Sequence, residues 1–67
     1  MKFGAALKEA RVRAGVSPGQ LAETAGWSRT HVHRVERQEN VSEATIERYC
    51  AALELEAELT LRATRRK

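Results

Sequence analysis

Five polar side chains between residues 29 and 37 are the first candidates for chemistry, because all of them can donate hydrogen bonds. On a helix with 100° between neighbours, they fall within about 140° of one another on one face. Such donors suit phosphate oxygens and the acceptors on the edges of nucleic-acid bases. An ordinary solvated helix face is the alternative, and the elements around these residues must decide between the two. The stripe contains three arginines, one histidine, one hydroxyl and no acid: Arg29, Thr30, His33, Arg34 and Arg37.

Patterns typical of catalysis or metal binding are missing from the sequence. The chain has no aspartate to complete a nucleophilic triad, and it has no glycine-rich phosphate loop. His31 and His33 are two residues apart, so on a helix they point about 200° away from one another and cannot share a metal ion. We therefore expect no enzymatic activity, no metal and no cofactor.

Turn signals place the stripe on the last of three short helices. A first helix is predicted to end at Gly15, because Phe3, Leu7, Ala10, Arg11 and Ala14 recur at helical spacing.

A second helix follows at once. Ser17 is a favourable N-cap, Pro18 suits the first helical position, and Gln20 completes a capping box. Gly26 ends this helix after about two turns, since glycine readily takes the left-handed conformation. Ser28 then caps a third helix. A connection this short forces the second and third helices to cross at a large angle, which is the geometry of a helix-turn-helix. That context favours DNA binding for the stripe.

The C-terminal part of the chain is predicted to hold a fourth helix and a strand. The helix runs from about Glu43 to Leu53, with Ile46, Tyr49, Cys50 and Leu53 at core spacing. After it, apolar and polar residues alternate strictly for about a dozen residues, which indicates a half-buried strand. A helix is possible there, because Glu, Ala and Leu are strong helix formers. A lone strand needs a partner, so we expect it to pair across a homodimer. The dimerisation residues would be Leu55, Ala57, Leu59 and Leu61.

Size and composition limit the remaining possibilities. The 67 residues form one domain, with residues 1–54 as a helix-turn-helix unit and residues 55–67 as a dimerisation strand and basic tail. The single cysteine excludes a disulfide framework and fits the cytoplasm. No apolar run is long enough to span a membrane. The net charge of +3 is uneven, because residues 41–58 are acidic and lie between two basic ends. The expected fold is mainly α.

The segment LKEARVRAGVSPGQLAETAGWSRTHVHRVERQ resembles the Cro/C1-type (XRE-like) helix-turn-helix family, and the resemblance covers roughly residues 3–55. It implies a four-helix lambda-repressor-like domain. The ending ERQENVSEATIERYCAALELEAELTLR is similar to HigA- and HipB-type antitoxins, in which the C-terminal extension forms a strand that pairs across the dimer. The resemblance implies a repressor that binds double-stranded DNA at a palindromic operator, associates with the nucleoid in the cytoplasm, and pairs with a cognate toxin protein. The alternatives are a stand-alone or phage-type repressor, or a protein-interaction module on the same scaffold.

The resemblance also implies roles for individual residues. Arg11 and Glu36 match the family's internal salt bridge between the first and third helices. The base-reading positions are Arg29, Thr30, His33 and Arg34. Pro18 departs from the family, which often has a phosphate-binding glutamine at this position. The phosphate contacts would come from the N-termini of the second and third helices, together with Ser17, Ser28, Arg37 and Asn40.

Overall fold

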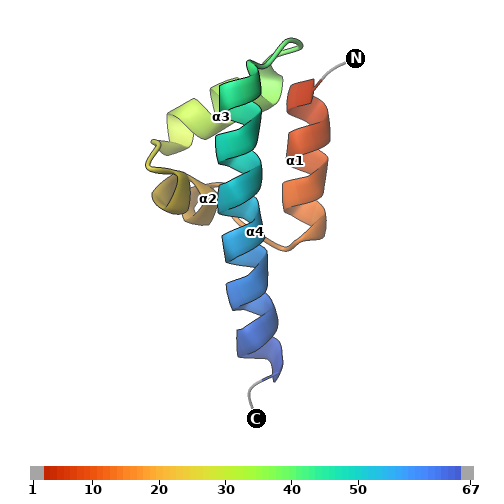
Figure 1. Cartoon of the computed structure of the whole chain (residues 1–67), viewed down its shortest axis with the longest axis vertical. Helices are drawn as coiled ribbons and strands as arrows, with labels where there is room; N and C mark the ends of the chain where they lie inside the picture. The colour runs from red at the N-terminus through yellow and green to blue at the C-terminus, as the bar shows by residue number, and fades with distance from the viewer. Residues whose placement is uncertain (1–2, 66–67) are drawn as a thin grey trace.

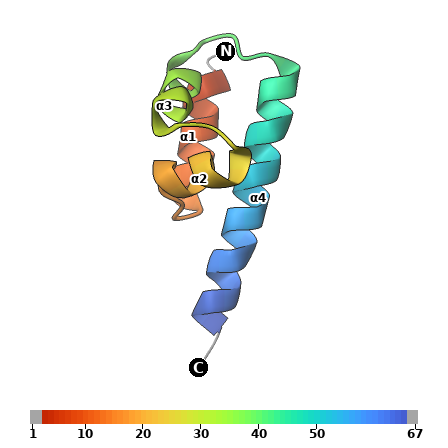
Figure 2. The same cartoon turned by 90° about the vertical axis from the view of Figure 1, so that its left-hand side faces the viewer.

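The computed structural model describes residues 3–65, with the side chains of residues 3–62. Its four helices are α1 (Phe3–Arg13), α2 (Pro18–Ala25), α3 (Arg29–Arg37) and α4 (Glu43–Arg65). α1, α2 and α3 gather around the first half of α4, and the second half of α4 extends beyond them (Figures 1 and 2). The four-helix, helix-turn-helix architecture expected from the sequence is confirmed.

The prediction of a C-terminal strand is wrong. α4 continues without a break from Glu43 to Arg65, and none of residues 3–65 lies in a strand. Extending a helix that has already formed needs no new nucleus, whereas a strand needs a second edge to pair with. Winding these residues into a helix also separates the predicted dimerisation residues. Leu55 and Leu59 lie on one side of α4, and Ala57 and Leu61 lie on the opposite side.

The core lies between the first half of α4 and the three shorter helices. Leu21, Val32, Val35 and Tyr49 are its largest fully buried side chains. Three residues whose helical spacing suggested the core side are exposed: Phe3 and Ala10 on α1, and Cys50 on α4. Their spacing is compatible with burial. The side of α4 that packs against the three shorter helices is centred on Tyr49, Ala52 and Leu53. Cys50 lies about 100° from Tyr49 around the helix and so falls outside that side.

Local capping sets the turn between α2 and α3. The Ser17 hydroxyl accepts a hydrogen bond from the Gln20 amide, and the Gln20 side chain accepts one from the Ser17 amide, so the predicted capping box is confirmed. Gly26 has a φ of 76°, and its amide donates to the carbonyls of Ala22 and Glu23. Ser28 then caps α3 by accepting from the His31 amide. The result is the tight crossing of α2 and α3.

The start of α1 is held by the end of α3 through backbone hydrogen bonds. The amides of Phe3 and Gly4 donate to the carbonyls of Glu39 and Gln38 at 3.2 and 3.1 Å. Gly4 is buried at this contact, and a Cβ there would lie 2.5 Å from the carbonyl oxygens of Val35 and Gln38. The close approach of α1 and α3 therefore requires glycine at this position.

We predict that Gly4→Ala lowers the free energy of unfolding by about 2 kcal/mol or more, because α1 must move off the rigid backbone of α3. Gly15→Ala is the control. Gly15 has a φ of 72°, and a Cβ at this position would have no neighbour within 4 Å, so only backbone strain of about 1 kcal/mol is expected. Urea unfolding of both variants gives the comparison. Gly4→Ala being the milder of the two would contradict this account of the α1–α3 contact.

A buried polar network joins α3 to α1 and α4. Arg11 Nε lies 2.8 Å from Glu36 Oε2, and Arg11 Nη1 donates to the Val16 carbonyl at 2.8 Å. The Tyr49 hydroxyl donates to Glu36 Oε2 at 2.5 Å and lies 3.2 Å from the Leu7 carbonyl oxygen. The Arg11 and Glu36 side chains are only 7% and 3% exposed. The structure thus brings together the two residues expected to form a salt bridge, and it adds Tyr49 as a third member.

The network keeps both members of the salt bridge charged. Burial alone would raise the pKa of Glu36, but hydrogen bonds from Arg11 and Tyr49 outweigh it and hold that pKa below its ordinary value. The hydrogen bond to Glu36 raises the pKa of Arg11 despite burial. Burial and the neighbouring carboxylate together raise the pKa of Tyr49, so its hydroxyl stays protonated and remains a donor.

We predict that Glu36→Gln costs about 3 kcal/mol of stability at neutral pH, because Arg11 stays buried without its counter-charge. The folded pKa of Glu36 lies below its ordinary value of 4.5. The stability that the carboxylate contributes is therefore complete above that value and is lost as the pH falls through the folded pKa. The gap between wild type and variant should be constant from about pH 5 to pH 7 and narrow below about pH 4.

Chemical unfolding at several pH values measures this gap. Glu9→Gln is the matched control, since the Arg13–Glu9 pair has the same 2.8 Å distance with side chains 78% and 66% exposed. Its loss should change stability little. A gap for Glu36→Gln that widens in acid would have the wrong sign for a carboxylate with a lowered pKa.

Candidate nucleic-acid interface

The exposed face of α3 is basic and carries no acidic side chain of that helix. The face opposite Val32 and Val35 is exposed, whereas Glu36, the only acid of α3, is buried against Arg11. The solvent on this side therefore meets three arginines and no carboxylate from α3. Side chains of this kind can donate to phosphates or to base edges, because they are long and all carry hydrogen-bond donors.

Most of the predicted base-reading residues line one shallow pocket on α3. Thr30, His33, Arg34 and Arg37 surround it, together with Gln38 at the end of the helix. Gln38 is not among the residues predicted from the sequence. Its position four residues after Arg34, and eight after Thr30, would have placed it on the same face of an extended α3. The pocket therefore combines three predicted base-reading residues, one predicted phosphate contact and one new residue.

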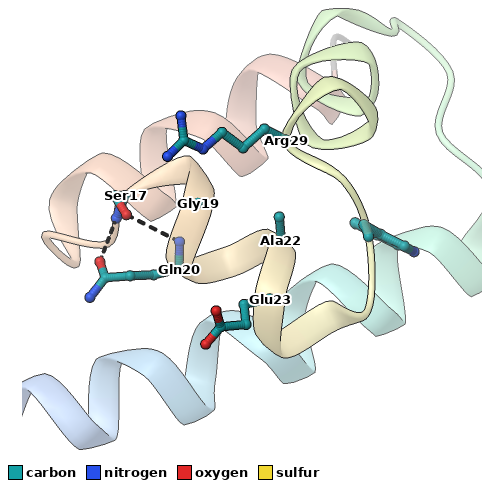
Figure 3. A pocket seen from close by; sticks show the side chains of 7 residues that line it. Ser17, Gly19, Gln20, Ala22, Glu23 and Arg29 are labelled. Atoms are coloured by element: carbon teal, nitrogen blue, oxygen red, sulfur yellow. Dashed lines mark hydrogen bonds between the residues drawn. The ribbon is translucent and has the colours of Figure 1, made fainter.

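Arg29 is directed elsewhere. Its side chain reaches back from the start of α3 over the first turn of α2, near Gly19 (Figure 3). A Cβ on Gly19 would lie 3.1 Å from Arg29 Nε, so the absence of a side chain at Gly19 leaves room for the guanidinium. Arg29 and His33 line a second pocket with Ser17, Pro18 and Gly19. The structure thus separates Arg29 from Arg34 and places it beside the α2 N-terminus, with His33 contributing to both pockets.

The other predicted phosphate contacts lie around this surface. Ser17 and Ser28 are exposed N-caps of α2 and α3, and each hydroxyl accepts a backbone hydrogen bond while keeping its own proton to donate. Asn40 is exposed in the connection between α3 and α4. Gln20 has its side-chain oxygen engaged by the Ser17 amide. The free amides of a helix start attract anions, so the caps and the exposed face of α3 form one extended surface.

The rings of Trp27 and His31 pack against one another beside the α2–α3 turn. Trp27 is half-buried against the core, with its ring 4.7 Å from the His31 ring in an edge-on arrangement and 6.4 Å from the Tyr49 ring. His31 is half-buried as well. These ring contacts pack the α2–α3 turn against the core. His33 is therefore the histidine on the exposed face of α3.

Other kinds of site find no support in the part of the chain that the structure describes. Residues 3–65 hold no cluster of His, Cys, Asp or Glu side chains that could bind a metal ion. Within the same residues, no helix is long and apolar enough to cross a membrane.

Comparison with known proteins identifies the family of this chain. No curated protein matches the chain significantly. A family model described as a helix-turn-helix domain matches residues 2–65, which is nearly the whole chain. The match covers the α2–α3 crossing, the exposed face of α3 and the long α4. The chain therefore belongs to this helix-turn-helix family of DNA-binding domains.

Proposed function

We propose that the chain is a sequence-specific transcriptional regulator, a repressor that binds a near-palindromic operator as a homodimer. The observation that carries the proposal is the exposed face of α3, which presents Arg29, Arg34 and Arg37 while Glu36 is withdrawn into the core. A twofold dimer of helix-turn-helix units would insert one α3 into each of two successive major grooves, about 34 Å apart.

The two pockets suggest that different residues contact the base edges and the phosphates of the DNA. Thr30, His33 and Arg34 are exposed around one pocket and precede Arg37, which lies at the end of α3, so we assign these three to base edges. Arg34 can make the bidentate contact to guanine O6 and N7. Arg29 is expected from the sequence to read bases as well. Its guanidinium lies over the α2 N-terminus, where a phosphate would be attracted, so we propose that Arg29 bridges a base edge and the backbone.

The remaining phosphate contacts are proposed for Ser17, Ser28, Arg37 and Asn40. Ser17 and Ser28 add hydroxyl donors to the amides of two helix starts. Arg37 lies at the end of α3 and Asn40 follows it, so both are placed to contact the sugar-phosphate backbone beyond the groove. These contacts would fix the orientation of the protein without selecting sequence.

An antitoxin role would add a second partner to this DNA-binding activity. The feature that favours it is a row of exposed acids on α4 at helical spacing, which suits a basic protein: Glu43, Glu47, Glu54 and Glu58. The likeness to antitoxins also included a C-terminal strand, and that segment is helical. A product of a neighbouring gene that co-purifies with this chain would support the antitoxin role. DNA binding without any such partner would leave a stand-alone repressor, and failure to bind DNA would leave a protein-interaction module.

We predict that Arg34→Ala weakens binding to the operator by about 1–3 kcal/mol, or roughly 5- to 150-fold, because a bidentate base contact is lost. Binding to a scrambled duplex should change little. Titrations of both duplexes at one salt concentration measure the difference, with DNA from upstream of the gene as the operator. Equal losses on the two duplexes would make Arg34 a phosphate contact.

Two further arginine variants calibrate this experiment. Arg37→Ala should weaken both duplexes alike and reduce the dependence of log K on log salt by about 0.9. Arg13→Ala removes an arginine of α1 that is 78% exposed and paired with Glu9, so it should leave both titrations unchanged. Wild-type protein that does not distinguish the operator from scrambled DNA would contradict the proposed function itself.

A further inference from the structure

The second half of α4 carries an apolar surface that the rest of the described chain leaves uncovered. Leu55 and Leu59 are 55% and 56% exposed and lie one turn apart on the same side of α4. They line a groove at the end of α2, together with Thr24, Glu56, Glu58 and Arg62. The Thr24 hydroxyl donates to the Glu56 carboxylate and so fastens α2 to α4 beside the groove. The groove is thus an apolar strip with acidic residues along it.

The charge order along this segment is complementary to itself. Glu54, Glu56 and Glu58 come first, and they are followed in the sequence by Arg62, Arg65, Arg66 and Lys67 with no further acid. Two such segments running parallel would place acid beside acid. Running antiparallel, Glu58 of each copy meets Arg62 of the other. The Glu58–Arg62 ion pair within one chain, at 3.4 Å with both side chains more than half exposed, contributes little and can be exchanged for a pair between copies.

We propose that the occupant of this groove is a second copy of the chain, paired antiparallel through α4 and centred near Thr60. This inference rests on the homodimer of the proposed function and names its interface. At this register the two Leu59 side chains lie together at the centre, and Glu58 lies level with the partner's Arg62. Leu61 and Ala57 lie on the far side of α4 and take no part.

The register also sets the distance between the two DNA-binding faces. Tyr49 ties α4 to the end of α3 through Glu36, and it lies eleven residues before Thr60. With a rise of 1.5 Å per residue, the Tyr49 residues of the two copies are about 33 Å apart along the axes of the paired α4 helices. One turn of DNA is about 34 Å, the spacing needed to present two recognition helices to successive major grooves. The same pairing that covers the leucines therefore matches the proposed operator geometry.

The interface is tested by sedimentation equilibrium on the full chain with a matched pair of leucine variants. Leu59→Lys should raise the dimer dissociation constant at least tenfold. Leu61→Lys changes a leucine of nearly equal exposure, 55%, on the opposite side of the same helix and should leave the constant unchanged. Circular dichroism checks that both variants are folded, which is expected because both positions lie outside the core. A monomeric wild type, an ineffective Leu59→Lys or an equally effective Leu61→Lys would overturn the interface.

The direction of pairing is tested with the single cysteine. Cys50 is exposed and lies on the side of α4 away from Leu55 and Leu59, so a spin label there does not obstruct the groove. The antiparallel pair places the two labels about 30 Å apart along the helix axes, whereas a parallel pair places them at the same level. Double electron–electron resonance gives the distance, and labels separated only by the width of a helix pair would overturn the antiparallel arrangement.

The outcomes are separable from those for DNA binding. A dimer with these properties that ignores the operator would refute the proposed function and leave the pairing intact. A wild type that selects its operator, but whose dimer is insensitive to Leu59→Lys, would refute the pairing alone.

Discussion

The buried contact between Arg11 and Glu36 is the interaction on which both the fold and the DNA-binding face depend. It joins the last turn of α1 to the last turn of α3, and Tyr49 extends it to α4. Burying a charge is costly unless it is paired and hydrogen-bonded, and among the described residues no buried side-chain polar atom lacks a partner. Satisfying this network fixes how far α3 stands from α1. It also removes the only acid of α3 from the surface, so one interaction both orients the helix and makes its outer face basic.

Much of the fold could be predicted from local signals. The capping residues Ser17 and Ser28, together with Gly26, mark the ends of α2 and α3 because each satisfies backbone groups that a helix leaves unpaired. The role of Gly4 could not be predicted, because it depends on carbonyls of residues 35 and 38 that only the folded chain brings near it. Burial was also hard to judge for Cys50, since helical spacing does not show how wide the covered side of a helix is.

The error at residues 55–63 has a specific physical cause. A strict alternation of apolar and polar residues is typical of a strand, but on a helix it produces two opposite apolar rows with acids between them. The choice between these depends on what precedes the segment. A helix that already packs through Tyr49, Ala52 and Leu53 extends at little cost, and the Thr24–Glu56 hydrogen bond supports the extension. The exposed face of α3 was easier to predict, because it follows from helical spacing alone. The direction taken by Arg29 was not predictable, because it depends on the room above Gly19.

The central claim is that DNA contacts α3 and the start of α2, while the acidic side of α4 stays in solvent. The most direct test is an NMR titration of ¹⁵N-labelled protein with an operator duplex. The account predicts that amide shifts concentrate in residues 17–20 and 28–40, and that the exposed acidic positions of α4 change little. Shifts that concentrate on the acidic side of α4 while α3 stays unperturbed would contradict it.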